Sequence, residues 1–155
     1  MAVTDWIDEI TEVWEFNNGK GGLVKSYRLY ENNEFPEALS VFPCAISYVT
    51  SVETQYSLGG PCIDTYEGVT EFHLVPNVSK VNIPYILPFF KRIRDAAAAH
   101  MNLGGLVAWW MLKTGGEPSI SLVTLQYGAE NPHLGLMVRW SCKENVTGDF
   151  TPAAG

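Results

Sequence analysis

Residues 134–143 alternate strictly between apolar and more polar side chains. The apolar set occupies the even positions, namely Leu134, Leu136, Val138, Trp140 and Cys142. The odd positions hold Gly135, Met137, Arg139, Ser141 and Lys143. A period of two predicts a β-strand with one buried and one wetter face, because successive side chains of a strand point to opposite sides of a sheet. We therefore expect a sheet whose other strands come from the preceding residues.

Two segments carry apolar residues at helical spacing. The first helix is expected over residues 4–16, where Thr4 is an N-cap and acidic side chains follow at the positive end of the dipole. The second is expected over residues 84–102, with Pro84 and Pro88 in its first turn. The apolar stripes of the two helices consist of Trp6, Ile7, Ile10, Val13 and Trp14, and of Phe89, Phe90, Ile93, Ala96, Ala97 and Met101.

Four further runs rich in apolar and β-branched residues predict strands. They lie at 39–49, 63–75, 106–112 and 120–127. Gly68 suits a bulge or a close backbone approach. Residues 50–61 are expected to form a long polar excursion, and residues 20–36 a turn and loop containing a short extended piece. Residues 128–132 form the loop of an antiparallel hairpin.

The predicted fold class is α+β, with elements in the order α-β-β-α-β-β-β. We expect a mixed, mainly antiparallel sheet of about five strands with the two helices packed on one face. A chain of 155 residues matches one domain. The predicted domain spans residues 1–144, and residues 145–155 form an extended C-terminal tail.

The composition suggests that part of the protein surface is covered by another subunit or partner. Charged residues make up 17% of the chain, against about 25% in typical globular domains. Aromatic residues, which are enriched at interfaces, make up 12%. The alternative is that most aromatic side chains are core, so the composition suggests oligomerisation without establishing it.

The net charge of −7 argues against a protein that neutralises nucleic-acid phosphates. A negative surface is compatible with a conduit through which DNA slides, because like charges oppose adhesion. The sequence shows neither a secretory signal nor an apolar run long enough for a membrane span, so we expect a reducing cytoplasm and no membrane contact.

Residue types for a cysteine hydrolase are present without a local signature. Cys44 or Cys62 would serve as nucleophile, one of His73, His100 and His133 as base, and Asp64 as the orienting carboxylate. The strand positions of the cysteines instead favour buried, inert thiols. Neither the cysteines nor the histidines have the close spacing of metal ligands, so no metal or cofactor is predicted.

Trp109 and Trp110 are adjacent on a predicted strand and therefore point to opposite faces. We expect one of them in the core and the other at a subunit contact.

Several segments together resemble the small neck and tail-completion proteins of tailed bacteriophages, most closely the tail terminator family. They are Tyr66-Glu67-Gly68, Asn82-Ile83-Pro84, the helix at 89–101, Leu125-Gln126-Tyr127-Gly128 and the strand at 134–140, within residues 40–144. The resemblance implies a non-catalytic virion protein of the neck or tail, assembled in the host cytoplasm. Its subunits would form a hexameric ring that caps the tail tube and docks to the head connector. DNA would pass through the channel, lined partly by the sheets, without sequence-specific binding.

On this hypothesis Trp109, Trp110 and Phe150 are the candidate subunit-interface residues, and the loops at 20–36 and 50–60 reach neighbouring subunits. Two alternatives remain open. The long excursion at 50–60 would also suit a head-completion or adaptor protein at another level of the neck. A small α+β ligand-binding domain or thiol hydrolase would instead use a pocket between the second helix and the sheet.

Overall fold

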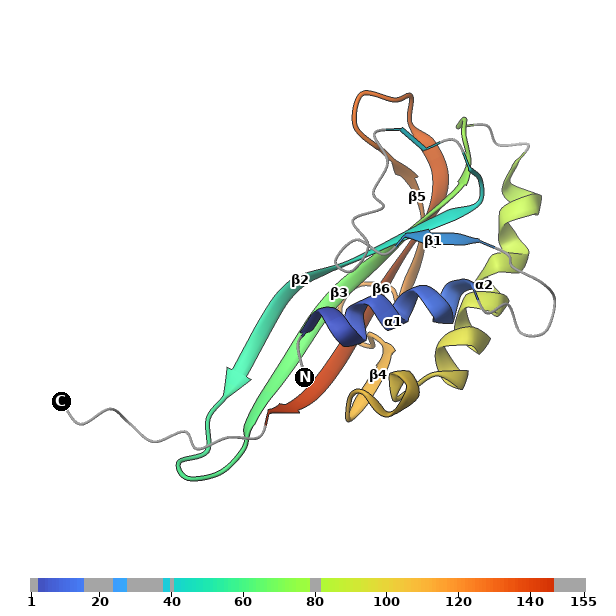
Figure 1. The fold of residues 1–155 in the computed structure, drawn as a ribbon. Helices are drawn as coiled ribbons and strands as arrows, with labels where there is room; N and C mark the ends of the chain where they lie inside the picture. The colour runs from blue at the N-terminus through green and yellow to red at the C-terminus, as the bar shows by residue number, and fades with distance from the viewer. Residues whose placement is uncertain (1–2, 16–23, 28–37, 40, 79–81, 147–155) are drawn as a thin grey trace.

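The computed structural model describes residues 3–15, 24–27, 38–39, 41–78 and 82–146 of an α+β fold (Figure 1). Its elements are α1 (Val3–Glu15), β1 (Lys25–Tyr27), β2 (Cys44–Gln55), β3 (Cys62–Val75), α2 (Ile83–Ala99), the 3-10 turn η2 (Leu103–Gly105), β4 (Trp109–Leu112), β5 (Ile120–Leu125) and β6 (His133–Val146). The predicted order omitted β1 as a separate strand, because three residues are too few to show a period.

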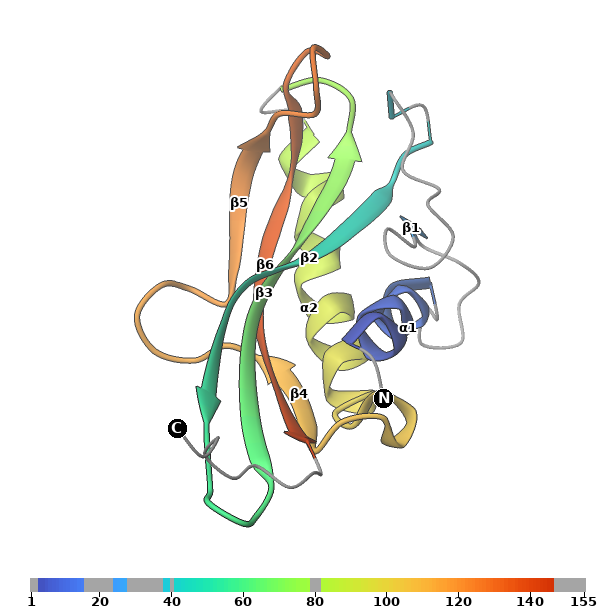
Figure 2. The same cartoon turned by 60° about the vertical axis from the view of Figure 1, so that its left-hand side comes forward.

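The sheet is mixed, with the strand order β1-β2-β3-β6-β4. Among the strands of the described residues, the β1–β2 pair alone is parallel, and the other pairs are antiparallel. β3 and β6 pair from Cys62↔Val146 to Val75↔Leu134 and form the centre of the sheet. β4 and β5 pair with different stretches of β6, so they follow each other along the side of β6 that β3 leaves open (Figure 2).

The alternation predicted for β6 is confirmed. Its five even-numbered apolar side chains are each at most 7% exposed and join one core cluster. The same cluster takes Trp6 and Ile10 from α1 and Phe89 and Ile93 from α2. Most of the two predicted apolar stripes therefore packs in this cluster, whereas Met101 lies beyond the end of α2 and is 45% exposed.

The prediction of a long polar excursion at residues 50–61 is wrong. β2 continues to Gln55 and pairs with β3 from Ser51↔Glu67 to Gln55↔Ile63, so only residues 56–61 connect the two strands. The result is an arm that extends past the helices (Figure 1). Because the β2 side of this arm is exposed throughout, its residues show no alternation of polarity.

The bulge or close backbone approach predicted at Gly68 is met only in part, because the register shift lies in the facing strand β2 and the close neighbour is a side chain. The β2–β3 register shifts between Val49 and Ser51, opposite Gly68 and Glu67. On the helix-covered face the indole of Trp140 lies over Gly68, where an ideal Cβ would come within 2.3 Å of the ring.

Several predicted boundaries shift. β2 begins at Cys44 and β4 at Trp109, later than expected. Pro88 lies inside α2 rather than in its first turn, and α2 ends at Ala99. β6 runs to Val146, two residues beyond the predicted end of the domain, and the rest of the predicted tail lies outside the described residues.

Candidate functional site

The two adjacent tryptophans point to opposite faces of the sheet. Trp110 is 0% exposed and packs against Trp14 and Trp140, with ring centroids 5.5 and 6.1 Å away. Its side chain therefore has no surface for a neighbouring subunit in this fold, which corrects its assignment to an interface. Trp109 pairs with Lys143 on the other face and is half-buried. Phe150, the third candidate, lies outside the described residues.

The face that carries Trp109 is not uniformly acidic. Glu67 pairs with Lys113 at 3.0 Å, and Glu117 pairs with Arg139 at 2.8 Å. Cationic side chains therefore pair with two of the carboxylates here.

The β2 edge of the sheet is open along the arm. β1 pairs only with residues 44–46 of β2, so among the described residues no strand pairs with the outer edge from Ser47 to Gln55. Val52 on this strand is 52% exposed, and Leu58 in the turn at the tip is 77% exposed. Open backbone groups beside exposed apolar side chains are typical of a surface that pairs with another chain.

A groove lies at the opposite edge, between α2 and the strands β4 and β5. One hollow of about 560 Å³ is lined by Leu87, Phe90, Lys91, Arg94, Leu112, Ser119 and Ile120. A second, of about 200 Å³, is lined by Arg94, Ala97, Ala98, Met101, Met111 and Leu112. The lining is mainly apolar, and its charged members are cationic.

The cysteines do not have the setting of a thiol nucleophile. Cys44 and Cys142 are 0% exposed. Burial raises the pKa of each of these two thiols to about 12. Burial and the nearby Asp64 carboxylate also raise the pKa of Cys62. A reactive cysteine needs the opposite, a lowered pKa and solvent access.

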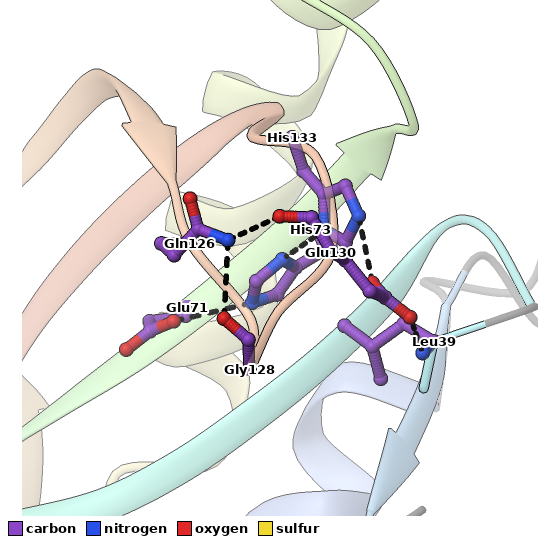
Figure 3. A network of polar contacts seen from close by, with 7 residues as sticks. All are labelled: Leu39, Glu71, His73, Gln126, Gly128, Glu130 and His133. Atoms are coloured by element: carbon purple, nitrogen blue, oxygen red, sulfur yellow. Dashed lines mark hydrogen bonds and ion pairs between the residues drawn. The ribbon is translucent and has the colours of Figure 1, made fainter. Parts of the chain in front are cut away.

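Two of the three histidines meet in the interior, which the sequence analysis missed. Nδ1 of His73 lies 2.9 Å from Nδ1 of His133 (Figure 3). Nε2 of His73 lies 3.1 Å from Oε1 of Glu71, and Nε2 of His133 lies 3.0 Å from Oε2 of Glu130. The first of these carboxylate contacts is a hydrogen bond, whereas the second has only the distance of an ion pair. The four side chains form one row, Glu71–His73–His133–Glu130.

The row connects three parts of the chain on the face opposite the helices. Glu71 accepts a hydrogen bond of 2.6 Å from the Tyr48 hydroxyl on β2. Glu130, in the β5–β6 connection, accepts one of 2.6 Å from the backbone N–H of Leu39. Gln126 closes the same connection by donating to the carbonyls of Gly128 and Glu130. Around the row lies a second, smaller apolar cluster of Tyr27, Leu39, Cys44, Ile46 and Tyr127, with Phe42 and Tyr48.

The groups in the row shift one another's pKa values. Burial works to raise the pKa of Glu71, but hydrogen bonds from His73 and Tyr48 outweigh it, and the pKa lies below its usual value. Burial and the adjacent His73 lower the pKa of His133, against the opposing effect of Glu130.

Topology could have revealed the histidine pair where local spacing could not. His73 lies near the end of a predicted strand, and His133 directly precedes the strand at 134–143. Antiparallel pairing of these strands places His73 opposite Gly135, two residues from His133 and on the same face. The third histidine, His100, lies apart, with Nδ1 2.8 Å from the Ala96 carbonyl.

Within the described ranges, no group of three or more His, Cys, Asp or Glu side chains is arranged to hold a metal ion. Nor is any helix in the described part of the chain long and apolar enough to cross a membrane. No protein-family model matches the chain, and no curated protein matches it significantly.

Proposed function

We propose that the chain is a structural subunit that assembles head to tail into a ring, as a tail terminator at the neck of a tailed bacteriophage. The observation that carries the proposal is the pair of unlike apolar surfaces at opposite edges of one sheet. The first is the arm with Val52 and Leu58, and the second is the groove between α2 and the β4–β5 edge. A contact between two different surfaces repeats from copy to copy and closes into a ring when the rotation permits.

The two surfaces differ in chemical character in a way that suits a contact between them. The arm presents Leu58 as a protruding apolar side chain, and the groove presents Leu87 and Phe90 in a hollow of about 560 Å³. Glu53 on the arm is exposed, whereas Lys91 and Arg94 line the groove. A second copy of the chain is therefore the occupant that we assign to the groove.

The position in the phage neck rests on the resemblance of residues 40–144 to the tail terminator family. In the proposed ring the arm and groove join neighbouring subunits, and the tail tube and the head connector contact the two ends of the ring. An adaptor or head-completion protein would use the same self-contact at another level of the neck, so the binding partner distinguishes the two.

Light scattering over a range of protein concentrations tests the ring. We expect a ring-sized species to form, either from the chain alone or once tail tubes are added. This species should dissociate on dilution. Leu58→Asp should weaken assembly at least about 10-fold, since burying one Leu side chain contributes about 1.5–3 kcal/mol. Val78→Asp is the matched control, because Val78 is 53% exposed and belongs to neither surface.

A chain that stays monomeric at every concentration and ignores tail tubes and heads would refute the ring. A ring that tolerates Leu58→Asp would refute only the arm-in-groove contact. A ring that binds heads rather than tail tubes would assign the protein to the adaptor level.

A further inference from the structure

The row Glu71–His73–His133–Glu130 contains three consecutive contacts between groups that carry lone pairs. The distances are 3.1 Å, 2.9 Å and 3.0 Å. His73 and His133 are 0% and 3% exposed, so bulk water does not separate the two rings. The Glu71–His73 and His73–His133 hydrogen bonds each need one proton, because two bare lone pairs repel each other and two facing N–H groups clash. The His133–Glu130 contact, which has the distance of an ion pair, needs a proton on Nε2, because a bare nitrogen lone pair would repel the carboxylate.

A count of protons follows from this geometry. Two neutral imidazoles carry one proton each. If those protons point outward to Glu71 and Glu130, the two Nδ1 atoms face each other as lone pairs at 2.9 Å. If either proton turns inward, a carboxylate faces a bare Nε2. The row therefore needs three protons, one more than two neutral histidines supply.

We propose that His73 and His133 form a proton-binding site that holds one extra proton between their Nδ1 atoms, and that this proton joins β3 to the start of β6, where Glu130 of the β5–β6 connection contacts the pair. The inference is independent of the proposed function. The positive charge of the pair lies between two carboxylates, an arrangement that compensates a buried charge. A second extra proton would make both rings imidazolium and set two N–H groups against each other.

The groups that face the pair come from every element packed around it. Glu71 and Tyr48 lie at the His73 end, on β3 and β2. Glu130 lies at the His133 end, and Tyr127 of the same connection packs edge-on at 6.1 Å from the His73 ring. Cys44 on β2 is the register partner of His73. The Cys44 thiol and the tyrosine hydroxyls keep their protons at neutral pH because their pKa values are raised, so they do not alter the count.

The proton count makes folding pH-dependent on both sides of a maximum. An unfolded histidine titrates near 6.5, so the unfolded pair and its glutamates bind two protons at pH 8 and four near pH 5.5. On the proposal, the folded row binds three, and the lowered pKa of His133 opposes the uptake of a fourth. Folding therefore takes up a proton at pH 8 and releases one near pH 5.5. The folding equilibrium constant should therefore be largest near pH 6.5 and fall on both sides, approaching about tenfold per pH unit once the pH is more than about one unit from the maximum.

Nuclear magnetic resonance of the ¹⁵N-labelled full chain tests the site directly, without a substitution. A proton bridging the two rings should produce a through-hydrogen-bond coupling between the Nδ1 nuclei of His73 and His133 at pH 6.5. The coupling should disappear at high and at low pH. His100, whose Nδ1 faces a carbonyl, is the internal control and should show none. Absence of the coupling, or nitrogen shifts that report a bound metal and revert with a chelator, would overturn the proposal.

The pH profile of urea unfolding provides the second test. The double variant His73→Gln/His133→Gln should lose both limbs of the profile, whereas His100→Gln should retain them. If the double variant does not fold, the single variant His133→Gln should lose the limb above pH 6.5, since a neutral amide removes the extra proton. Two limbs that persist in every histidine variant would assign them to other groups and overturn the inference.

Discussion

Replacing Gly68 with alanine tests the packing that joins the arm to the body of the sheet. An ideal Cβ at this position lies 2.3 Å from Cη2 and Cζ2 of Trp140 and 2.8 Å from Cε2. Carbon atoms in contact are normally about 3.5–4.0 Å apart, so the indole would have to move by roughly 1 Å or more. It has little room to do so, because Trp140 is 0% exposed and donates a 3.1 Å hydrogen bond to Thr70.

The expected loss follows from two opposing effects. Overpacking a core costs about 1–3 kcal/mol, while removing a glycine from a strand contributes about 0.5–1 kcal/mol. Gly68→Ala should therefore lower the free energy of unfolding by about 1–2 kcal/mol, measured as a lower urea midpoint at unchanged m-value.

A double-mutant cycle identifies the cause. A phenyl ring at position 140 does not reach the positions of Cη2 and Cζ2, so in a Trp140→Phe background the alanine should be neutral or slightly stabilising. The coupling between the two sites should then be about 1–3 kcal/mol, within the range for residues in contact. An equal loss in both backgrounds would refute the assignment of the effect to the indole.

Two further predictions concern the interior. Gly135→Ala should abolish cooperative folding, because an ideal Cβ would lie 1.9 Å from the backbone carbonyl oxygen of Phe72; a circular-dichroism melt with a wild-type midpoint would contradict this. Cys44 and Cys142 should resist a thiol reagent at pH 8 until urea unfolds the chain, since a pKa of about 12 leaves only about one thiol in 10,000 ionised. Rapid labelling of either cysteine in the folded protein would show that its thiol is not buried in solution.

The spacing of residues within each segment was sufficient to predict most of the helices and strands. The strict period of two at 134–143 predicted both β6 and its buried face, and all five even positions lie in the core. The same period separated Trp109 from Trp110, although it could not say which one was buried. That choice depends on β4 pairing with β6, which places Trp110 beside Cys142 on the face covered by the helices.

The sequence by itself determined the fold class, the two helices and the faces of the central strand, because these depend on side-chain spacing within a single element. Only the tertiary structure decided the arm, the groove and the histidine pair. The arm is a strand because β3 supplies its hydrogen-bond partners, and its own polar residues show no period that could indicate it. His73 and His133 are 60 residues apart and meet because the register of β3 with β6 carries them to the same end of the sheet.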